Sequence, residues 1–186
     1  MSEYLKACDM VLSECNLALS SIDEGAVDQY IEMLENAEQV FFVGVGRVLL
    51  SMQAIAKRFA HLGFRCHVVG ETTEPAITDK DVLVVASGSG ETLHSVAIAK
   101  KAKSLGVKII HIGSNKNSSL APITDLMIQI PTKTKHGGAG EIDSQQPMTS
   151  LFEQALLLFG DIVAFLIIQR RGGDMADLWK YHANLE

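Results

Sequence analysis

The chain has 186 residues, and 47% of them are hydrophobic, which predicts one folded domain with a substantial core and excludes a disordered chain. Its 16 basic and 22 acidic side chains give a net charge of −6, which argues against a nucleic-acid partner and against an anionic membrane surface. Three cysteines without zinc-like spacing, and an N-terminus unlike a signal peptide, indicate a reduced cytoplasmic protein.

The first predicted element is an amphipathic helix at the N-terminus. Apolar or small side chains recur there in steps of three and four, which is the signature of one helix face. This face consists of Tyr4, Cys8, Val11, Cys15, Ala18 and Ile22. The face packs either on the helix's own domain or against another subunit, and the sequence leaves both open.

A second helix is predicted over residues 21–36, and strands then alternate with helices. The predicted strands are residues 40–43, 65–69, 81–86, 107–112 and 126–130, and the later helices are residues 49–62, 92–105 and 147–171. Pro147 suits the first turn of the last helix. The most apolar part of that helix contains Asp161 and is shorter than the roughly 20 residues of a membrane span. We expect a single domain over 1–186, with the helices of 1–36 and 147–182 packed on it.

The predicted strands are nearly continuous apolar runs, which favours a parallel sheet covered by helices on both faces, an α/β fold. Ligands of such sheets bind beyond the carboxyl ends of the strands, near the point where the strand order reverses. Two turns rich in glycine fall at strand ends, residues 44–47 and residues 87–92. We therefore expect a small-molecule site between these turns.

The turn at residues 87–92 joins a buried strand to a helix N-terminus. It carries the hydroxyls of Ser87, Ser89 and Thr92 and the flexible backbone of Gly88 and Gly90. Free N–H groups and the partly positive helix end would bind a phosphate group there. An ordinary glycine-rich turn with a capping hydroxyl is the alternative. The turn is not a P-loop, because it lacks that motif's spacing and lysine.

The turn at residues 44–47 begins like a dinucleotide-binding fingerprint, Gly44-Val45-Gly46. Its third glycine would fall at position 49, which is Leu49, so we expect no nicotinamide cofactor. Arg47 follows as a cation fixed at a strand end, which could hold a phosphate or a sugar oxygen. An exposed arginine without such a role is the alternative.

Glu153 lies at the start of the apolar part of the last helix. A carboxylate in apolar surroundings can acquire a raised pKa and act as a general base near neutral pH. A solvated glutamate or a structural ion pair is the alternative, and Asp161 could equally be structural.

The six histidines form no convincing catalytic or metal-binding pattern. His67, His94 and His111 lie in strand-like or helical runs and are interpreted as structural, His61 ends a helix, and His182 lies near the C-terminus, where histidines are usually solvated. No set of His, Cys, Asp and Glu has metal-ligand spacing, and no Ser-His-Asp arrangement stands out.

Residues 131–146 form a long connection before the last helix. Loops of this length are usually functional or mobile, so both a lid over the site and simple surface disorder remain open. The segment contains Lys133, Lys135, His136, Gly137, Gly138 and Gly140.

The serine-rich turn in this α/β setting resembles the sugar isomerase (SIS) domain. Four further segments, in the same order along nearly the whole chain, resemble the 6-phospho-3-hexuloisomerase family: residues 61–63, 70–77, 146–154 and 182–186. The resemblance implies a five-stranded parallel sheet in a flavodoxin-like three-layer sandwich. It also implies interconversion of D-arabino-hex-3-ulose 6-phosphate and D-fructose 6-phosphate, in the ribulose monophosphate pathway of formaldehyde handling. The resemblance implies no metal or organic cofactor. It does imply a homotetramer with active sites between subunits.

The resemblance also implies roles for individual residues. The turn at 87–92 would hold the phosphate, Glu153 would be the base, and Arg47 beside Gly46 would steady substrate oxygens. His182 or His61 would assist proton transfer, while Glu71 and Thr72 would shape the sugar pocket. These roles predict an enediol mechanism that depends on Glu153. Another phosphosugar isomerase and a non-catalytic phosphosugar-binding protein remain alternatives.

One position departs from the family pattern. The family usually has Gly-x-Gly-Arg-Ser-Gly at the first turn, whereas this chain has Val48 and Leu49 in place of the last two residues. Two bulky apolar side chains replace a hydroxyl and a glycine, so we expect an effect on substrate hydrogen bonding or on the backbone freedom of this turn.

Overall fold

A computed structural model describes residues 1–134, 140–173, 175–182, 184 and 185. Its centre is a five-stranded sheet with the order β2-β1-β3-β4-β5, in which all neighbouring strands are parallel. The strands are β1 (Val40–Val43), β2 (Cys66–Val68), β3 (Val82–Ala86), β4 (Lys108–Gly113) and β5 (Leu126–Gln129). The order reverses between β1 and β3, which defines the expected switch point.

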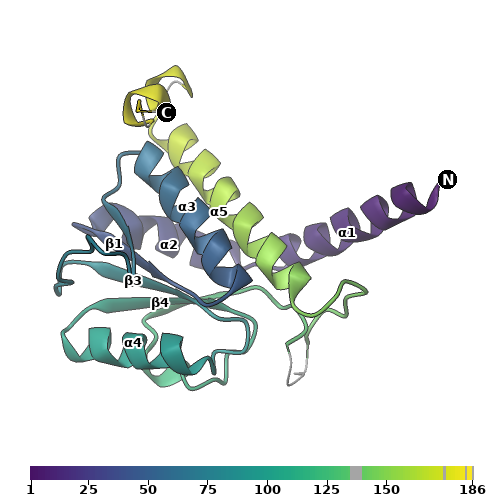
Figure 1. The fold of residues 1–186 in the computed structure, drawn as a ribbon, viewed down its shortest axis with the longest axis horizontal. Helices are drawn as coiled ribbons and strands as arrows, with labels where there is room; N and C mark the ends of the chain where they lie inside the picture. The colour runs from purple at the N-terminus through teal and green to yellow at the C-terminus, as the bar shows by residue number, and fades with distance from the viewer. Residues whose placement is uncertain (135–139, 174, 183, 186) are drawn as a thin grey trace.

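Helices cover both faces of the sheet, as the continuous apolar strands predict (Figure 1). They are α1 (Glu3–Ser20), α2 (Glu24–Asn36), α3 (Arg47–His61), α4 (Leu93–Ser104) and α5 (Ser150–Arg170), with two short 3-10 helices, η1 (Ala121–Ile123) and η2 (Met175–Tyr181). One core cluster joins the sheet to α2, α3 and α5, and a second joins Phe41 and Leu83 to α4. The predicted α/β class and three-layer arrangement are confirmed.

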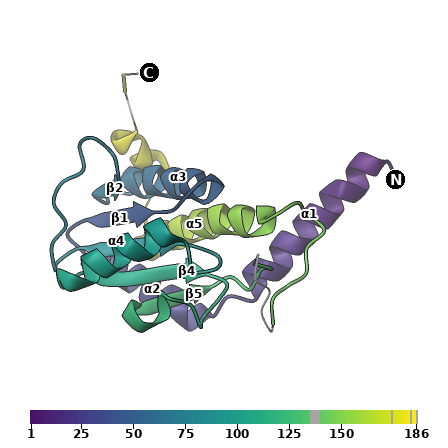
Figure 2. The same ribbon diagram turned by 60° about the horizontal axis from the view of Figure 1, so that its bottom comes forward.

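Helix α1 extends away from the body of the molecule, and only its C-terminal part packs there (Figure 2). Its predicted inner face is correct in part, since Cys15 and Ala18 are buried. Tyr4, Leu5 and Leu12 remain exposed. Residues 21–23 connect α1 to α2. The last of them, Asp23, caps α2, because its carboxylate accepts a hydrogen bond of 2.8 Å from the Ala26 N–H.

The last helix begins three residues later than the sequence predicts. Pro147 is not in its first turn, because Met148 has a φ of 55° and therefore lies outside the helical region. By length and apolar composition α5 could cross a membrane. However, 56% of its 18-residue apolar segment is buried inside the protein, as in the core helix of a soluble protein. Helix α5 packs along α3 (Figure 1).

Close packing of α3 on α5 depends on Gly160. A Cβ atom at this position would lie 2.3 Å from Cγ1 of Ile55, a distance that real atoms do not adopt. The missing side chain therefore lets the two helices approach. Because both begin at the carboxyl edge of the sheet, this contact brings their first turns together there.

Candidate active site

The two predicted turns line one cavity at the carboxyl edge of the sheet. Its volume is about 240 Å³. Val48 lines it from the first turn of α3, Ser87 to Ser89 from the turn after β3, and Phe152 and Glu153 from α5. The switch point of this fold therefore holds hydroxyls, backbone groups and a carboxylate in one hollow.

The serine-rich turn is held by its own side chains. The hydroxyls of Ser87 and Thr92 lie 3.1 Å apart, and the Gly90 N–H donates to the Ser87 hydroxyl at 3.1 Å. The Glu91 N–H donates to the Ser89 hydroxyl at 3.2 Å. The predicted arrangement of these residues around a common site is thus present in the structure.

Gly90 is required in this turn for two reasons. Its φ of 66° lies in the left-handed region that favours glycine, and an added Cβ would lie 2.2 Å from the Ser118 hydroxyl oxygen. Gly88 is not required for space in the same way, because a Cβ atom there would meet only the Phe152 ring at ordinary contact distance.

Backbone donors remain available at this turn. Among the described residues, the N–H groups of Gly88 and Ser89 have no acceptor. The Thr92 hydroxyl contacts Ser87 and does not cap α4, so the N–H groups in the first turn of α4 have no side-chain cap either. Free N–H groups at a helix N-terminus, beside three hydroxyls, are suited to an anion such as phosphate.

Glu153 lines the same cavity as the serine-rich turn, and both of its carboxylate oxygens accept hydrogen bonds. Oε2 accepts a hydrogen bond from Nε of Arg47, and Oε1 accepts one of 2.9 Å from the Thr149 hydroxyl. The Glu153 side chain is only 9% exposed, whereas the Arg47 side chain is 65% exposed. The solvated-glutamate alternative is therefore wrong: Glu153 forms an ion pair with Arg47, and Glu153 itself lines the cavity.

Arg47 is placed by the turn that precedes it. Gly46 forms the N-cap of α3 with a φ of 63°, a left-handed backbone conformation that favours glycine. The backbone can therefore reverse sharply, and Arg47 begins α3 beside the start of α5. The next residue, Val48, contributes an apolar side chain to the cavity lining, at a position where the family resemblance implies a hydroxyl.

Several residues that line the cavity were not predicted from the sequence as site residues. The hydroxyls of Ser114 and Thr132 lie 3.0 Å apart in the cavity wall, and Thr149 holds Glu153. Ser114 follows the fourth strand, so its position at a strand end was the available signal. Thr132 and Thr149 had no local signal, because only the folded chain brings them to the other turns.

Gly46, Arg47 and Gly90 do not line this cavity but adjoin residues that do, and two further pairs of predicted residues lie away from it. Glu71 and Thr72 are exposed on the connection after β2. The rings of His61 and His182 stack on each other, with centroids 5.1 Å apart, where α3 ends and the chain turns back after α5. The 15 residues of α3 separate Arg47 from His61 by roughly 20 Å. Within one chain, neither histidine reaches Glu153, and their catalytic role stays a prediction.

The long connection before α5 is only partly described. Lys133 and Thr134 line the cavity, and the Lys133 ammonium pairs with Asp143 at 2.9 Å. Residues 135–139, including Lys135, His136, Gly137 and Gly138, lie outside the described residues, so the lid hypothesis is untested.

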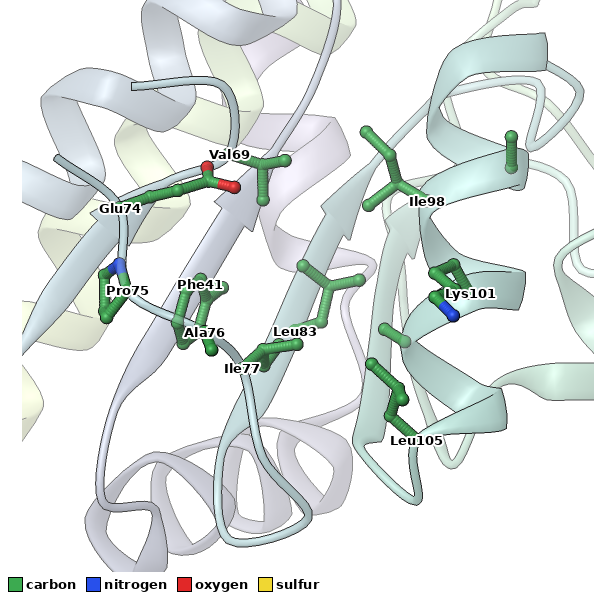
Figure 3. Close-up of a pocket in the computed structure, with 12 residues that line it drawn as sticks. Phe41, Val69, Glu74, Pro75, Ala76, Ile77, Leu83, Ile98, Lys101 and Leu105 are labelled. Carbon is green, nitrogen blue, oxygen red and sulfur yellow. The ribbon is translucent and has the colours of Figure 1, made fainter. Parts of the chain in front are cut away.

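A larger hollow of about 400 Å³ lies on the other face of the sheet, beside α4 (Figure 3). Phe41, Leu83 and Ile98 contribute to its mainly apolar wall, and Glu74 and Lys101 are its charged residues. None of its described lining residues carries a hydroxyl, in contrast to the smaller cavity. In the part of the chain that the structure describes, no group of three or more His, Cys, Asp or Glu side chains could hold a metal ion.

Fold and site together define an α/β domain with a cavity suited to an anionic ligand, and comparison with known proteins identifies its family. The SIS domain family matches residues 33–158, so the chain belongs to this family. A 3-hexulose-6-phosphate isomerase of Bacillus subtilis is 36% identical, over 95% of each chain. One of Mycobacterium gastri is also 36% identical, over 95% of this chain and 88% of its own.

A solved structure is similar over nearly the whole chain. It belongs to a Methanococcus jannaschii protein for which a molecular function of 3-hexulose-6-phosphate isomerase was inferred. The two chains are 33% identical, the TM-score is 0.83, and the match covers 97% of this chain and 99% of that one.

Proposed function

We propose that this protein is a phosphosugar isomerase that interconverts D-arabino-hex-3-ulose 6-phosphate and D-fructose 6-phosphate. The observation that carries the proposal is that one small cavity is lined both by a buried carboxylate with two hydrogen-bonded oxygens and by a turn with three hydroxyls and free N–H groups. An isomerase of this kind needs both: one group to move a carbon-bound proton and one to hold the distant phosphate. The names of the similar proteins supply 3-hexulose 6-phosphate as the substrate, and the family resemblance implies fructose 6-phosphate as its partner.

In the proposed reaction, Glu153 removes the proton from C2 of the 3-ketose. The electrons of that C–H bond form the C2–C3 double bond, and the C3 carbonyl oxygen becomes the oxyanion of an enediolate. A proton then moves between the oxygens on C2 and C3, and the Glu153 proton returns to C3, which leaves the 2-ketose. Substrate and product are isomers, so the balance needs no oxidant and no reductant.

Arg47 and the serine-rich turn support this step in different ways. The Arg47 guanidinium lies against Glu153 and remains largely exposed, so it can also stabilise the negative charge that develops on the enediolate oxygens. The hydroxyls of Ser87, Ser89 and Thr92, with the N–H groups of Gly88 and Ser89, would bind the phosphate. Phosphate binding would align the sugar carbons with the carboxylate.

We also propose that the chain forms a homotetramer with its sites between subunits. The supporting observations are the projecting α1 helix with exposed Tyr4, Leu5 and Leu12, and the position of His61 and His182 far from Glu153 of their own chain. In such an assembly, the histidines or the exposed Glu71 and Thr72 would act in a neighbour's site. A cytoplasmic location, the absence of a nucleic-acid partner and the place in the ribulose monophosphate pathway stay predictions.

The test is a coupled assay with freshly prepared hex-3-ulose 6-phosphate. Formation of fructose 6-phosphate, and no turnover of aldopentose phosphates, is the expected result. Turnover of a pentose phosphate alone would identify another phosphosugar isomerase. Binding of fructose 6-phosphate without turnover of any substrate would identify a non-catalytic binding protein, an alternative that the apolar Val48 favours.

A further inference from the structure

His111 is a fully buried histidine for which the reaction above has no use. It lies on β4 with an exposed fraction of 0%, and its Nε2 atom lies 3.0 Å from the carbonyl oxygen of Ser87. A carbonyl oxygen only accepts, so Nε2 must carry the hydrogen and donate it. Burial lowers the pKa of His111, which favours the neutral ring.

Two glycines make room for this ring. A Cβ atom on Gly113 would lie 2.4 Å from Nε2 of His111, and one on Gly90 would lie 3.2 Å from its Cε1 atom. Side chains at both positions would displace the imidazole. The contact between His111 and Ser87 therefore depends on glycines in β4 and in the serine-rich turn.

The end of β4 also binds the other carbonyl groups of that turn. The carbonyl oxygen of Gly88 accepts hydrogen bonds from the N–H groups of Ser114 and Asn115, at 2.9 and 3.1 Å. The carbonyl oxygen of Ser89 accepts one of 3.3 Å from the Asn115 side-chain amide. Three successive carbonyls of the turn are thus held by β4 and the residues that follow it.

This arrangement has a cost as well as a benefit. Within the described residues, Nδ1 of His111 and the hydroxyl of Ser118 are buried without a hydrogen-bond partner. Burial of unpaired polar atoms is unfavourable, and an apolar side chain on β4 would avoid it at position 111. The bond from His111 to Ser87 is the feature that an apolar residue could not replace.

We infer that His111 and Asn115 are positioning residues for the anion-binding turn. They hold the carbonyls of Ser87 and Ser89 against β4, so that the N–H groups of Gly88 and Ser89 stay free for the ligand's anionic group. The kinetic part of this inference rests on the proposed isomerase function. The binding part does not, because inorganic phosphate alone can report on the turn.

The first test compares phosphate binding by purified variants, with the dissociation constant of inorganic phosphate measured by calorimetry. His111→Leu and Asn115→Leu remove the donors, and we expect each to weaken binding about tenfold. His111→Gln keeps a donor near the Nε2 position and should stay within about threefold of the wild type. Ile109→Val, a buried change on the same strand, is the control and should leave binding unchanged.

The same variants separate positioning from a merely structural role in the isomerase assay. We expect His111→Leu and Asn115→Leu to raise KM with little change in kcat. Unchanged phosphate binding in both variants would overturn the inference, and so would an equal loss in Ile109→Val. If the wild type binds phosphate but does not isomerise the sugar, the proposed reaction fails while the binding comparison still decides the positioning role.

A measurement on the wild type covers the case in which His111→Leu does not fold. Nitrogen NMR of the His111 ring at neutral pH should show hydrogen on Nε2 and none on Nδ1. Hydrogen on Nδ1 instead would contradict the bond to the Ser87 carbonyl and would overturn the proposed role of His111.

Discussion

At the scale of single residues, the proposed chemistry depends on how Glu153 is held. Its two oxygens accept from Arg47 and from Thr149, and its side chain is nearly buried, so one orientation toward the cavity is fixed. A carboxylate fixed in this way can transfer a proton without first losing conformational freedom. A substitution that tests the role of Glu153 should keep the shape of its side chain and remove the carboxylate that accepts the proton.

Glu153→Gln makes that change. We expect kcat to fall by about 1,000-fold, because an amide cannot accept the carbon-bound proton. The dissociation constant of phosphate should stay within about threefold, since the serine-rich turn is intact. Thr149→Val is the control for orientation alone and should cost about tenfold in kcat. Near-normal turnover of Glu153→Gln would remove Glu153 from the mechanism.

Of the two residues that depart from the pattern implied by the family resemblance, Val48 and Leu49, Val48 lines the cavity. We expect Val48→Ser to lower KM for the sugar phosphate a few-fold, because it adds a hydroxyl that can bond to the substrate. The measurement is steady-state kinetics. Val48→Thr is measured beside it, because threonine adds the hydroxyl and keeps the shape of valine. If neither variant changes KM, the side chain at position 48 does not contact the substrate.

At the scale of elements, the packing of α3 on α5 brings Arg47 to Glu153. We expect Gly160→Ala to lower the free energy of unfolding by about 1–3 kcal/mol, because the added methyl group would overlap Ile55. Urea unfolding measures this change. Gly173→Ala is the control, since the nearest atom to its added methyl group would be 3.8 Å away. Equal stability of both variants would show that the two helices tolerate a wider separation.

Asp125 joins α4 to β4 through two contacts. Its Oδ2 atom accepts from the Ile109 N–H at 2.8 Å and from the Lys103 ammonium at 2.6 Å. Burial raises the pKa of Asp125, but the Ile109 N–H and the Lys103 side chain outweigh burial and hold the pKa below its ordinary value of 3.8. A lowered pKa in the folded state means that the ionised carboxylate stabilises the fold.

We therefore expect Asp125→Asn to lower the free energy of unfolding by about 1 kcal/mol at pH 7, with allowance for partial exposure. The stabilisation is complete above the unfolded-state pKa and is lost as the pH falls through the lower folded-state pKa. The difference between wild type and variant should thus shrink in urea unfolding as the pH falls below about 4. A difference that is independent of pH would contradict this assignment.

The sequence predicted helices and strands better than it predicted contacts between residues far apart in the chain. Apolar runs such as 40–43 and 81–86 are local and mark strands directly, and the turn at 87–92 carries its own hydroxyls. The start of α5 was missed because the backbone of Met148 leaves the helical region with no local marker. His111 was interpreted as structural because its partner, Ser87, lies on another strand end, and no spacing along the chain records that contact.

At the scale of the whole molecule, the projecting α1 predicts association. We expect Leu12→Glu, which places a charge on an exposed apolar part of α1, to dissociate the proposed tetramer into smaller species. Light scattering after size-exclusion chromatography measures the mass. Leu93→Glu, on an exposed leucine of α4, is the control and should leave the mass unchanged. A wild type that runs as a monomer would contradict the proposed assembly.

The central claim is that the cavity moves a proton between C2 and C3 of a phosphoketose. NMR of fructose 6-phosphate incubated with the protein in D₂O tests it most directly, because reversal of the enediol exchanges the proton on C3. The account predicts deuterium at C3 with the wild type and none with Glu153→Gln. Deuterium at C1 alone would indicate an aldose–ketose isomerase, and no deuterium at any carbon would contradict the proposed reaction.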